Sequence, residues 1–182
     1  MITPKTSLLI VLESEESLLE RPSTSALGAE LVLAAKTLSL PVIYAHFATA
    51  QSVHLANPPV SEPAPSRIPL ELGIDDWATS KLGRTIAETE RDQIVVAGAW
   101  LEEAVTFFAL NAVARGLDVY CPVDAIATLA PLREHICYSR LAQAGVVQTT
   151  TMQVLREWAA LTSDPGIRQG LLDLARARAV AS

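Results

Sequence analysis

The sequence predicts an α/β fold, a three-layer α/β/α sandwich with a mostly parallel, six-stranded sheet. Short runs of β-branched and apolar residues alternate with segments of helical periodicity, which is typical of parallel strands joined by crossover helices. Several runs are apolar throughout, as expected of strands that helices cover on both faces. The chain has 182 residues and no internal repeat or break in composition, which predicts a single domain over 1–182.

Six segments have the composition of strands. The clearest is Gln-Ile-Val-Val-Ala-Gly-Ala at 93–99, which is apolar after its first residue. The segment at 7–13 is apolar through its middle and ends on Glu13. In chain order, the predicted strands cover 7–13, 42–47, about 68–74, 93–99, 118–122 and 146–149.

Periodicity and capping residues predict the helices. Ser23–Ser25 offer N-caps for the first helix, and Gly116 and Gly145 follow two later helices as C-caps. Asp164-Pro165 begins an extra C-terminal helix. The predicted helices cover about 23–39, 79–89, 102–115, 133–144, 152–161 and 165–180.

A proline-rich segment interrupts this alternation at about 48–69. It has five prolines between Pro58 and Pro69, which disfavour regular structure and predict an ordered excursion over the surface. A long loop in a compact domain usually contributes to a site or a subunit contact. We therefore expect one of these roles for this segment.

Charge and hydropathy exclude two classes of partner. The net charge of −6 argues against nucleic acid, because phosphate neutralisation needs clustered Lys and Arg. The longest nearly pure apolar stretch, Ile94 to Leu101, is far shorter than a membrane span. Only Leu8 to Leu12 are apolar before Glu13, too few for a signal peptide, so we expect a cytoplasmic protein.

No cofactor or metal is expected. Gly98-Ala-Trp-Leu-Glu-Glu is neither a dinucleotide fingerprint nor a phosphate-binding loop. The two cysteines form no Cys-x-x-Cys pair, and their contexts favour small buried hydrophobes over nucleophiles. The histidines lie too far apart in sequence for a helical pair of ligands. The cysteines are Cys121 and Cys137, and the histidines are His46, His54 and His135.

The turn at Gly98–Ala104 is the first place to look for a site. Ligands of open parallel sheets bind beyond the carboxyl ends of the strands, and a helix begins here with free N–H groups. Glu13 ends the first strand at the same edge. The carboxylate of Glu13 is either part of a site or a solvated group at the end of its strand, and the sequence leaves both interpretations open.

The stretch from Ile94 to Ala125 resembles the isochorismatase-like cysteine hydrolases, and more narrowly their YcaC-like branch. That branch has a strand ending in Gly-x-x-Thr-x-x-Cys-Val, then a helix, a Gly-x-x-Val strand and an Asp-Ala turn. Further matching segments lie at 7–13, 76–77, 140–146 and 154–158, whereas 48–66 matches least. The resemblance implies the Rossmann-like sandwich fold of that family.

The resemblance also implies a catalytic trio that this chain does not retain. Family members attack a carbonyl with a cysteine thiolate, assisted by an aspartate after the first strand and a basic residue. Position by position, the nucleophile falls on Ala104, and the basic residue on Leu70 with Arg67 the nearest substitute. The acid falls on Glu13, or on Leu12 if the register is one residue shorter.

A backbone feature of the family does not depend on side chains. The resemblance places an oxyanion hole at the N–H groups of Trp100 and Ala104, beside a cis peptide bond from Ala99 to Trp100. Leu101 takes the place of the family's threonine, and Trp77 is a candidate pocket wall. Since Glu102 and Glu103 would repel an anion, we expect any ligand to be small and neutral or cationic.

Three functional hypotheses follow from these residues. The first is a family member without its nucleophile that acts in binding or assembly. The alternative is a divergent hydrolase of small amide-like or related substrates, with water activated by Glu13. The third, compatible with the first, is a scaffold role as a homo-oligomer, the assembly type of the resembled branch.

Overall fold

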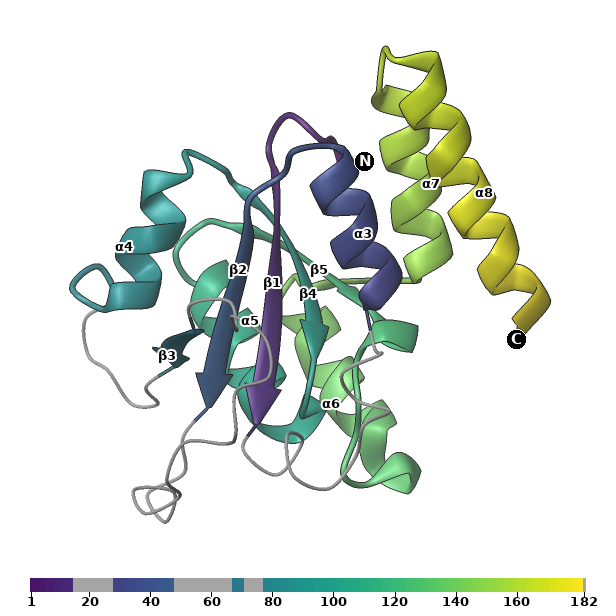
Figure 1. Ribbon diagram of the computed structural model, residues 1–182. Helices are drawn as coiled ribbons and strands as arrows, with labels where there is room; N and C mark the ends of the chain where they lie inside the picture. Colours follow the sequence, from purple (N-terminus) through teal and green to yellow (C-terminus); the bar gives the residue numbers. More distant parts are fainter. Residues whose placement is uncertain (15–27, 48–66, 71–76, 182) are drawn as a thin grey trace, which may run out of the picture.

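The computed structural model describes residues 1–14, 28–47, 67–70 and 77–181. In this part of the chain, six parallel strands form one sheet in the order β3-β2-β1-β4-β5-β6 (Figure 1). The predicted α/β fold with a parallel sheet is confirmed. The strands are β1 (Ser7–Ser14), β2 (Val42–Phe47), β3 (Arg67–Leu70), β4 (Gln93–Gly98), β5 (Asp118–Pro122) and β6 (Val147–Thr149).

Helices join and cover these strands. The predicted helix at 102–115 begins instead with a π-helical turn, η2, before continuing as α5. The predicted helix at 133–144 follows a short 3₁₀ turn, η4 (Pro131–Arg133). The helices are α3 (Ala29–Thr37), α4 (Lys81–Glu88), η2 (Leu101–Val105), α5 (Thr106–Val113), α6 (Glu134–Gln143), α7 (Thr151–Leu161) and α8 (Pro165–Ala181).

Two hydrophobic clusters lie on opposite faces of the sheet and make the three layers. The first cluster joins β-strand residues to α4, η2, α5 and α6, and the second joins them to α3, α7 and α8 (Figure 1). Alternation along β1 assigns its side chains to the two faces, because successive residues of a strand point to opposite sides. Leu8, Ile10 and Leu12 belong to the first cluster, whereas Leu9 belongs to the second and Val11 packs against it.

Part of the predicted proline-rich excursion is a strand. Residues 67–69 lie in β3, and Pro69 is paired in register with His46 of β2. The excursion was predicted to reach 69 and was wrong at its end, whereas the strand predicted at about 68–74 overlaps β3. Pro69 is tolerated because β3 is an edge strand of the described sheet, where a missing N–H leaves one side of the ladder intact. The rest of that segment, 48–66, and the Ser23–Ser25 caps lie outside the described residues.

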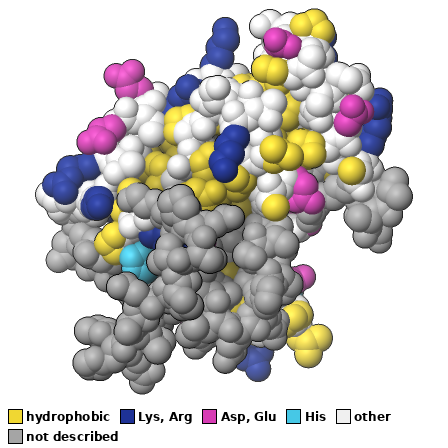
Figure 2. All heavy atoms as spheres, in the orientation of Figure 1, with side chains coloured by type: hydrophobic (Ala, Val, Ile, Leu, Met, Phe, Trp, Pro, Cys, Tyr) yellow, Lys and Arg dark blue, Asp and Glu magenta, His cyan; other side chains and the backbone are white. Residues whose placement is uncertain are grey.

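The described surface mixes charges of both signs. In the orientation of Figure 2, Lys and Arg side chains are scattered between Asp and Glu over the described part of this face. None of the described helices is both long enough and apolar enough to span a bilayer.

Candidate functional site

The chain makes a tight turn where β4 meets η2. Gly98 has a φ of 115°, and a Cβ atom there would lie 1.9 Å from the carbonyl oxygen of Leu12, so only glycine fits. The N–H of Ala99 donates to that same oxygen at 2.9 Å, which fixes the turn against β1. The peptide bond between Ala99 and Trp100 is cis, as the resemblance implied.

The backbone N–H groups after this turn fall into two sets. Leu101 donates to Ala127 O at 2.8 Å, and Glu103 and Val105 both donate to Trp100 O at 3.2 Å. The N–H groups of Trp100 and Ala104 are the pair predicted for an oxyanion hole, and that role stays a prediction. The side chain of Leu101 is fully buried, so this residue contributes packing to the turn.

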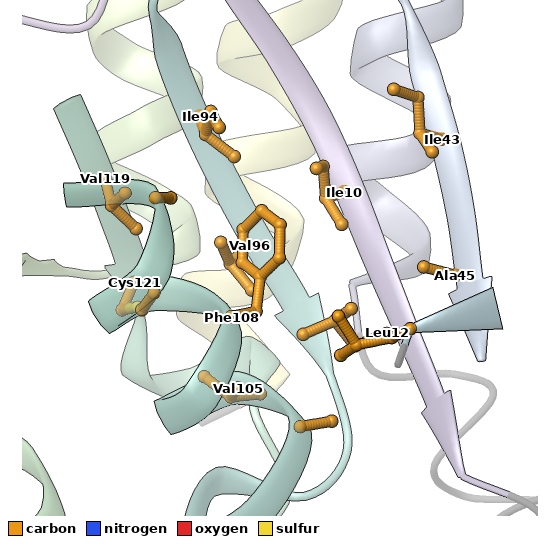
Figure 3. Close-up of a cluster of buried hydrophobic side chains, with 14 of the residues drawn as sticks. Ile10, Leu12, Ile43, Ala45, Ile94, Val96, Val105, Phe108, Val119 and Cys121 are labelled. Atoms are coloured by element: carbon orange, nitrogen blue, oxygen red, sulfur yellow. The ribbon is translucent and has the colours of Figure 1, made fainter. Parts of the chain in front are cut away.

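Ala104 lies inside the first hydrophobic cluster and not in an open site. Its exposed fraction is 0%, and the same cluster contains Leu12 at 1% and Leu70 at 8%. Figure 3 shows Leu12 on the sheet with Val105 and Phe108 of the covering helix beside the sheet residues. The predicted nucleophile and basic positions, and the alternative acid position, are thus all members of one hydrophobic cluster.

Glu13 belongs to a polar group on the opposite face. It follows Val11 by two residues, and its carboxylate forms an ion pair with the guanidinium of Arg67. Tyr44 shares this neighbourhood: burial and the charge of Glu13 raise the pKa of its hydroxyl, against a smaller lowering by Arg67. The structure therefore joins Glu13 to Arg67 and separates it by the sheet from the cluster that contains Ala104.

Two members of this polar group were missed from the sequence. Tyr44 is paired in register with Val11 and Arg67, and His46 with Glu13. The Nδ1 atom of His46 is buried and has no hydrogen-bond partner among the described residues. The signal was the spacing of two within 42–47, which places both side chains on one face of the strand.

Glu102 holds the segment that follows β5. Its carboxylate accepts hydrogen bonds from the hydroxyl of Thr128 and from the N–H groups of Leu129 at 3.0 Å and Ala130 at 2.9 Å. Burial raises the pKa of this carboxyl, but these hydrogen bonds outweigh burial and leave the pKa below its ordinary value. Glu102 thus has a structural contact in addition to its predicted effect on anions.

Glu102→Gln is expected to lower the free energy of unfolding by about 1–2 kcal/mol at pH 7, because a neutral amide accepts these hydrogen bonds less strongly. The folded carboxyl has the lower pKa, so its stabilisation is present above the unfolded pKa and is lost as the pH falls through the folded pKa. Urea denaturation at pH 7 and pH 3 measures this difference. Glu88→Gln, at an exposed carboxyl on α4, is the matched control and should change little.

Neither cysteine has the environment of a thiolate nucleophile. Cys121 is fully buried in β5, and burial raises the pKa of its thiol to about 12. Burial also raises the pKa of Cys137 on α6, and the nearby charge of Glu102 raises it further. Because thiolate formation needs a lowered pKa, these environments agree with the sequence-based expectation of two unreactive thiols.

Trp77, the candidate pocket wall, and Trp100 both pack against other parts of the molecule. Trp77 stacks at a tilt on Phe108 with ring centroids 5.6 Å apart, and the guanidinium of Arg115 lies 5.1 Å from the Trp77 centroid. Trp100 is buried, and its Nε1 has no hydrogen-bond partner among the described residues. No group of metal-ligating side chains occurs in the described part of the chain.

The comparisons with known proteins agree with this fold. Residues 25–153 match the model of the Isochorismatase domain. A curated relative, "Probable hydrolase YcaC" of Escherichia coli, is 32% identical over 89 residues. That match covers 47% of this chain and 43% of the relative, so the chain spans less than half the length of the curated relative it matches.

Two solved structures of YcaC proteins are similar over nearly the whole chain. The E. coli YcaC structure, described as an octameric hydrolase of unknown specificity, is 23% identical with a TM-score of 0.75. The alignment covers 99% of this chain and 95% of that one. YcaC from Pseudomonas aeruginosa is 18% identical with a TM-score of 0.73, and 96% of this chain and 91% of that chain are covered. The family match and the shared fold together show that this chain belongs to the isochorismatase family.

Proposed function

We propose that this isochorismatase-family protein is not a cysteine hydrolase and acts instead in assembly or in binding a small neutral molecule. The observation that supports this most directly is the joint burial of Leu12, Leu70 and Ala104 in one hydrophobic cluster. We assign the acid, base and nucleophile positions of active relatives to these three residues, with the acid register ending at Leu12 and not at Glu13. None of the three side chains can transfer a proton or attack a carbonyl.

The binding part of this proposal rests on the resemblance, which places two carbonyl-binding N–H groups at the turn, one of them on the buried Ala104. The N–H groups of Trp100 and Ala104 do not depend on side-chain identity and would donate to a carbonyl oxygen. The apolar surroundings favour a neutral ligand, because a charge would lose its hydration there without a partner. An amide or related carbonyl compound has the required chemistry.

A hydrolysis assay tests the proposal. The panel contains simple amides, nicotinamide-like rings and isochorismate-type vinyl ethers, and a catalytically active isochorismatase-family enzyme serves as the positive control. We expect no turnover above the uncatalysed rate for the purified chain. Turnover that is lost in a Glu13→Ala variant would contradict the proposal.

The second candidate is a divergent hydrolase in which Glu13 activates water. The ion pair with Arg67, beside Tyr44 and His46, is the observation that favours it, because it supplies an acid–base group and a cation at the strand ends. Here Glu13→Gln removes activity, and the rate falls at low pH as the carboxylate is protonated. Leu12→Ala would leave that chemistry in place, so the two variants separate the candidates.

The assembly part of the proposal is a homo-oligomer in the cytoplasm. The structural neighbour from E. coli is described as octameric and shares this fold, and both described cysteines are free thiols. Light scattering on the purified chain tests the assembly directly. A single monomeric species at micromolar concentration would contradict it.

A further inference from the structure

Four polar side chains share one face of the sheet at the carboxyl ends of β1, β2 and β3. Tyr44 is paired in register with Arg67, and His46 with Glu13, so their side chains point to the same side. In Figure 1 the arrowheads of β1 and β2 end at the same edge of the sheet, with β3 beside β2. We call these four residues the strand-end group. Ligands of open parallel sheets bind beyond this edge.

The ion pair of the strand-end group spans the middle strand. Glu13 belongs to β1 and Arg67 to β3, and β2 lies between these two strands. The pair therefore crosses the end of β2 on the face that carries Tyr44 and His46. The exposed fraction is 19% for the Glu13 side chain and 31% for that of Arg67, so the pair is partly desolvated and still open to a ligand.

The apolar cover of this face stops short of the strand ends. Val42 of β2 and Val11 of β1 still pack against the second hydrophobic cluster. Tyr44, the next residue of β2 on this face, does not belong to that cluster in the described part of the chain. The described helices therefore cover the middle of these strands and leave the strand-end group as a separate polar surface.

The strand-end group has hydrogen-bonding capacity to spare. Arg67 directs Nε and Nη2 at Glu13, with Nη2 3.5 Å from Oε1, and its Nη1 has no partner among the described residues. The Tyr44 hydroxyl makes no hydrogen bond to the described part of the chain either. The Nδ1 atom of His46 is buried and equally without a described partner. Because buried polar atoms are nearly always paired, this nitrogen indicates a further group beside it.

We propose that the strand-end group binds a neutral polyhydroxyl molecule such as a sugar. This inference goes beyond the proposed function, because the group lies on the face opposite the cluster of Ala104 and its role requires no turnover. Glu13 and Arg67 together carry no net charge. An anionic ligand is repelled by the carboxylate and a cationic ligand by the guanidinium, which favours a neutral ligand.

Hydroxyl groups fit this mixture of donors and acceptors. Each hydroxyl both donates and accepts, so a diol can donate to the Glu13 carboxylate while it accepts from Arg67 Nη1. Tyr44 and His46 Nδ1 are then available to further hydroxyl groups of the same molecule. A simple amide has one oxygen and one amino group and so engages fewer members of the group. Acidic side chains near strand ends hold ribose hydroxyls in this way in dinucleotide-binding folds.

Titration calorimetry of the full chain with D-ribose and D-glucose tests the site. We expect saturable binding of at least one sugar with a Kd of about 1–10 mM, as for a small ligand held by a few hydrogen bonds. Gluconate and glucosamine carry a charge on a similar skeleton and should bind about tenfold more weakly or less. Acetamide that binds as tightly as the sugars would overturn the polyhydroxyl assignment.

Variants of the ion pair locate the binding. Glu13→Gln and Arg67→Gln each remove one charged partner, and each is expected to raise the Kd of the sugar about tenfold or more. Asp173→Asn and Arg176→Gln, at the exposed ion pair of α8, are the matched controls and should leave the Kd unchanged. Circular dichroism shows that each variant is folded. Sugar binding that withstands both Glu13→Gln and Arg67→Gln would place the ligand elsewhere and overturn the inference.

The imidazole of His46 provides a readout in the unaltered chain. With ¹⁵N-labelled histidine, the sugar should shift the Nδ1 resonance of His46 and leave His135 on α6 unchanged. No saturable binding of either sugar, or binding with an unmoved His46 resonance, overturns the inference and leaves water as the partner of Nδ1. Such a result does not affect the proposed function, because the hydrolysis assay and light scattering test that function without these sugars.

Discussion

Leu12→Asp is expected to lower the free energy of unfolding by about 3–5 kcal/mol at pH 7, because it removes buried apolar volume and places a carboxyl in the core. Leu12 is 1% exposed and shares its cluster with Leu70 and Ala104. Burial disfavours the ionised form, so the introduced carboxyl should have a raised pKa in the folded state. Its destabilisation should therefore grow as the pH rises above about 4, the ordinary pKa of an aspartate in the unfolded chain.

Leu12→Asn is the matched control for this prediction. Asparagine has nearly the same size and polarity as aspartate but no titratable group. The destabilisation by Leu12→Asn should therefore lack the added pH dependence expected for Leu12→Asp. Chemical denaturation of both variants between pH 4 and pH 8 measures the difference. An Asp variant nearly as stable as the unaltered chain would mean that position 12 lies in a hydrated site, which would contradict the proposed loss of the catalytic centre.

Trp158→Ala is expected to lower the free energy of unfolding by about 3–5 kcal/mol. Trp158 on α7 is fully buried in the second hydrophobic cluster, where helices α3 and α8 also pack. Its removal leaves a large cavity between these helices and the sheet. Thermal and urea denaturation measure the loss, and a cost below about 1 kcal/mol would show that α7 is not anchored there.

Trp158→Phe separates the contribution of packing to stability from that of the indole N–H group. The Nε1 atom is buried and has no hydrogen-bond partner among the described residues, so phenylalanine loses volume but no hydrogen bond. We expect it to cost clearly less than the alanine variant. The N-terminal end of α7 should stay in place in both, because Asp124 accepts from the Thr151 N–H at 2.7 Å and from its hydroxyl at 3.0 Å.

The sequence was a good guide to the strands. The predicted strand at 118–122 matches β5, and 42–47 matches β2, because both are short segments rich in β-branched and aromatic residues. The π-helical turn before α5 was harder to predict from the sequence. A π-helical turn has the same residue preferences as an α-helix, and only the structure shows that the Thr106 hydroxyl donates to Leu101 O there.

The acid position shows why the site was harder to predict from the sequence than the fold. Glu13 and Leu12 were both open as candidates, and a shift of one residue along a strand moves a side chain to the other face of the sheet. The presence of a carboxylate favours Glu13 for the acid position of the family. The packing of Leu12 in the hydrophobic cluster that contains Ala104 favours Leu12 for this position instead. The partner of Glu13 is the first residue of β3, Arg67, which lies one residue before the strand predicted at about 68–74 and within the predicted proline-rich excursion.

The ends of the sheet bear on how copies of this protein can meet. In the described part of the chain, the outer strands have four residues in β3 and three in β6, and β3 includes Pro69. Short edges and a proline discourage the addition of further strands from other molecules. The addition of further strands at either edge of the described sheet is therefore disfavoured, which opposes its open-ended growth into fibrils.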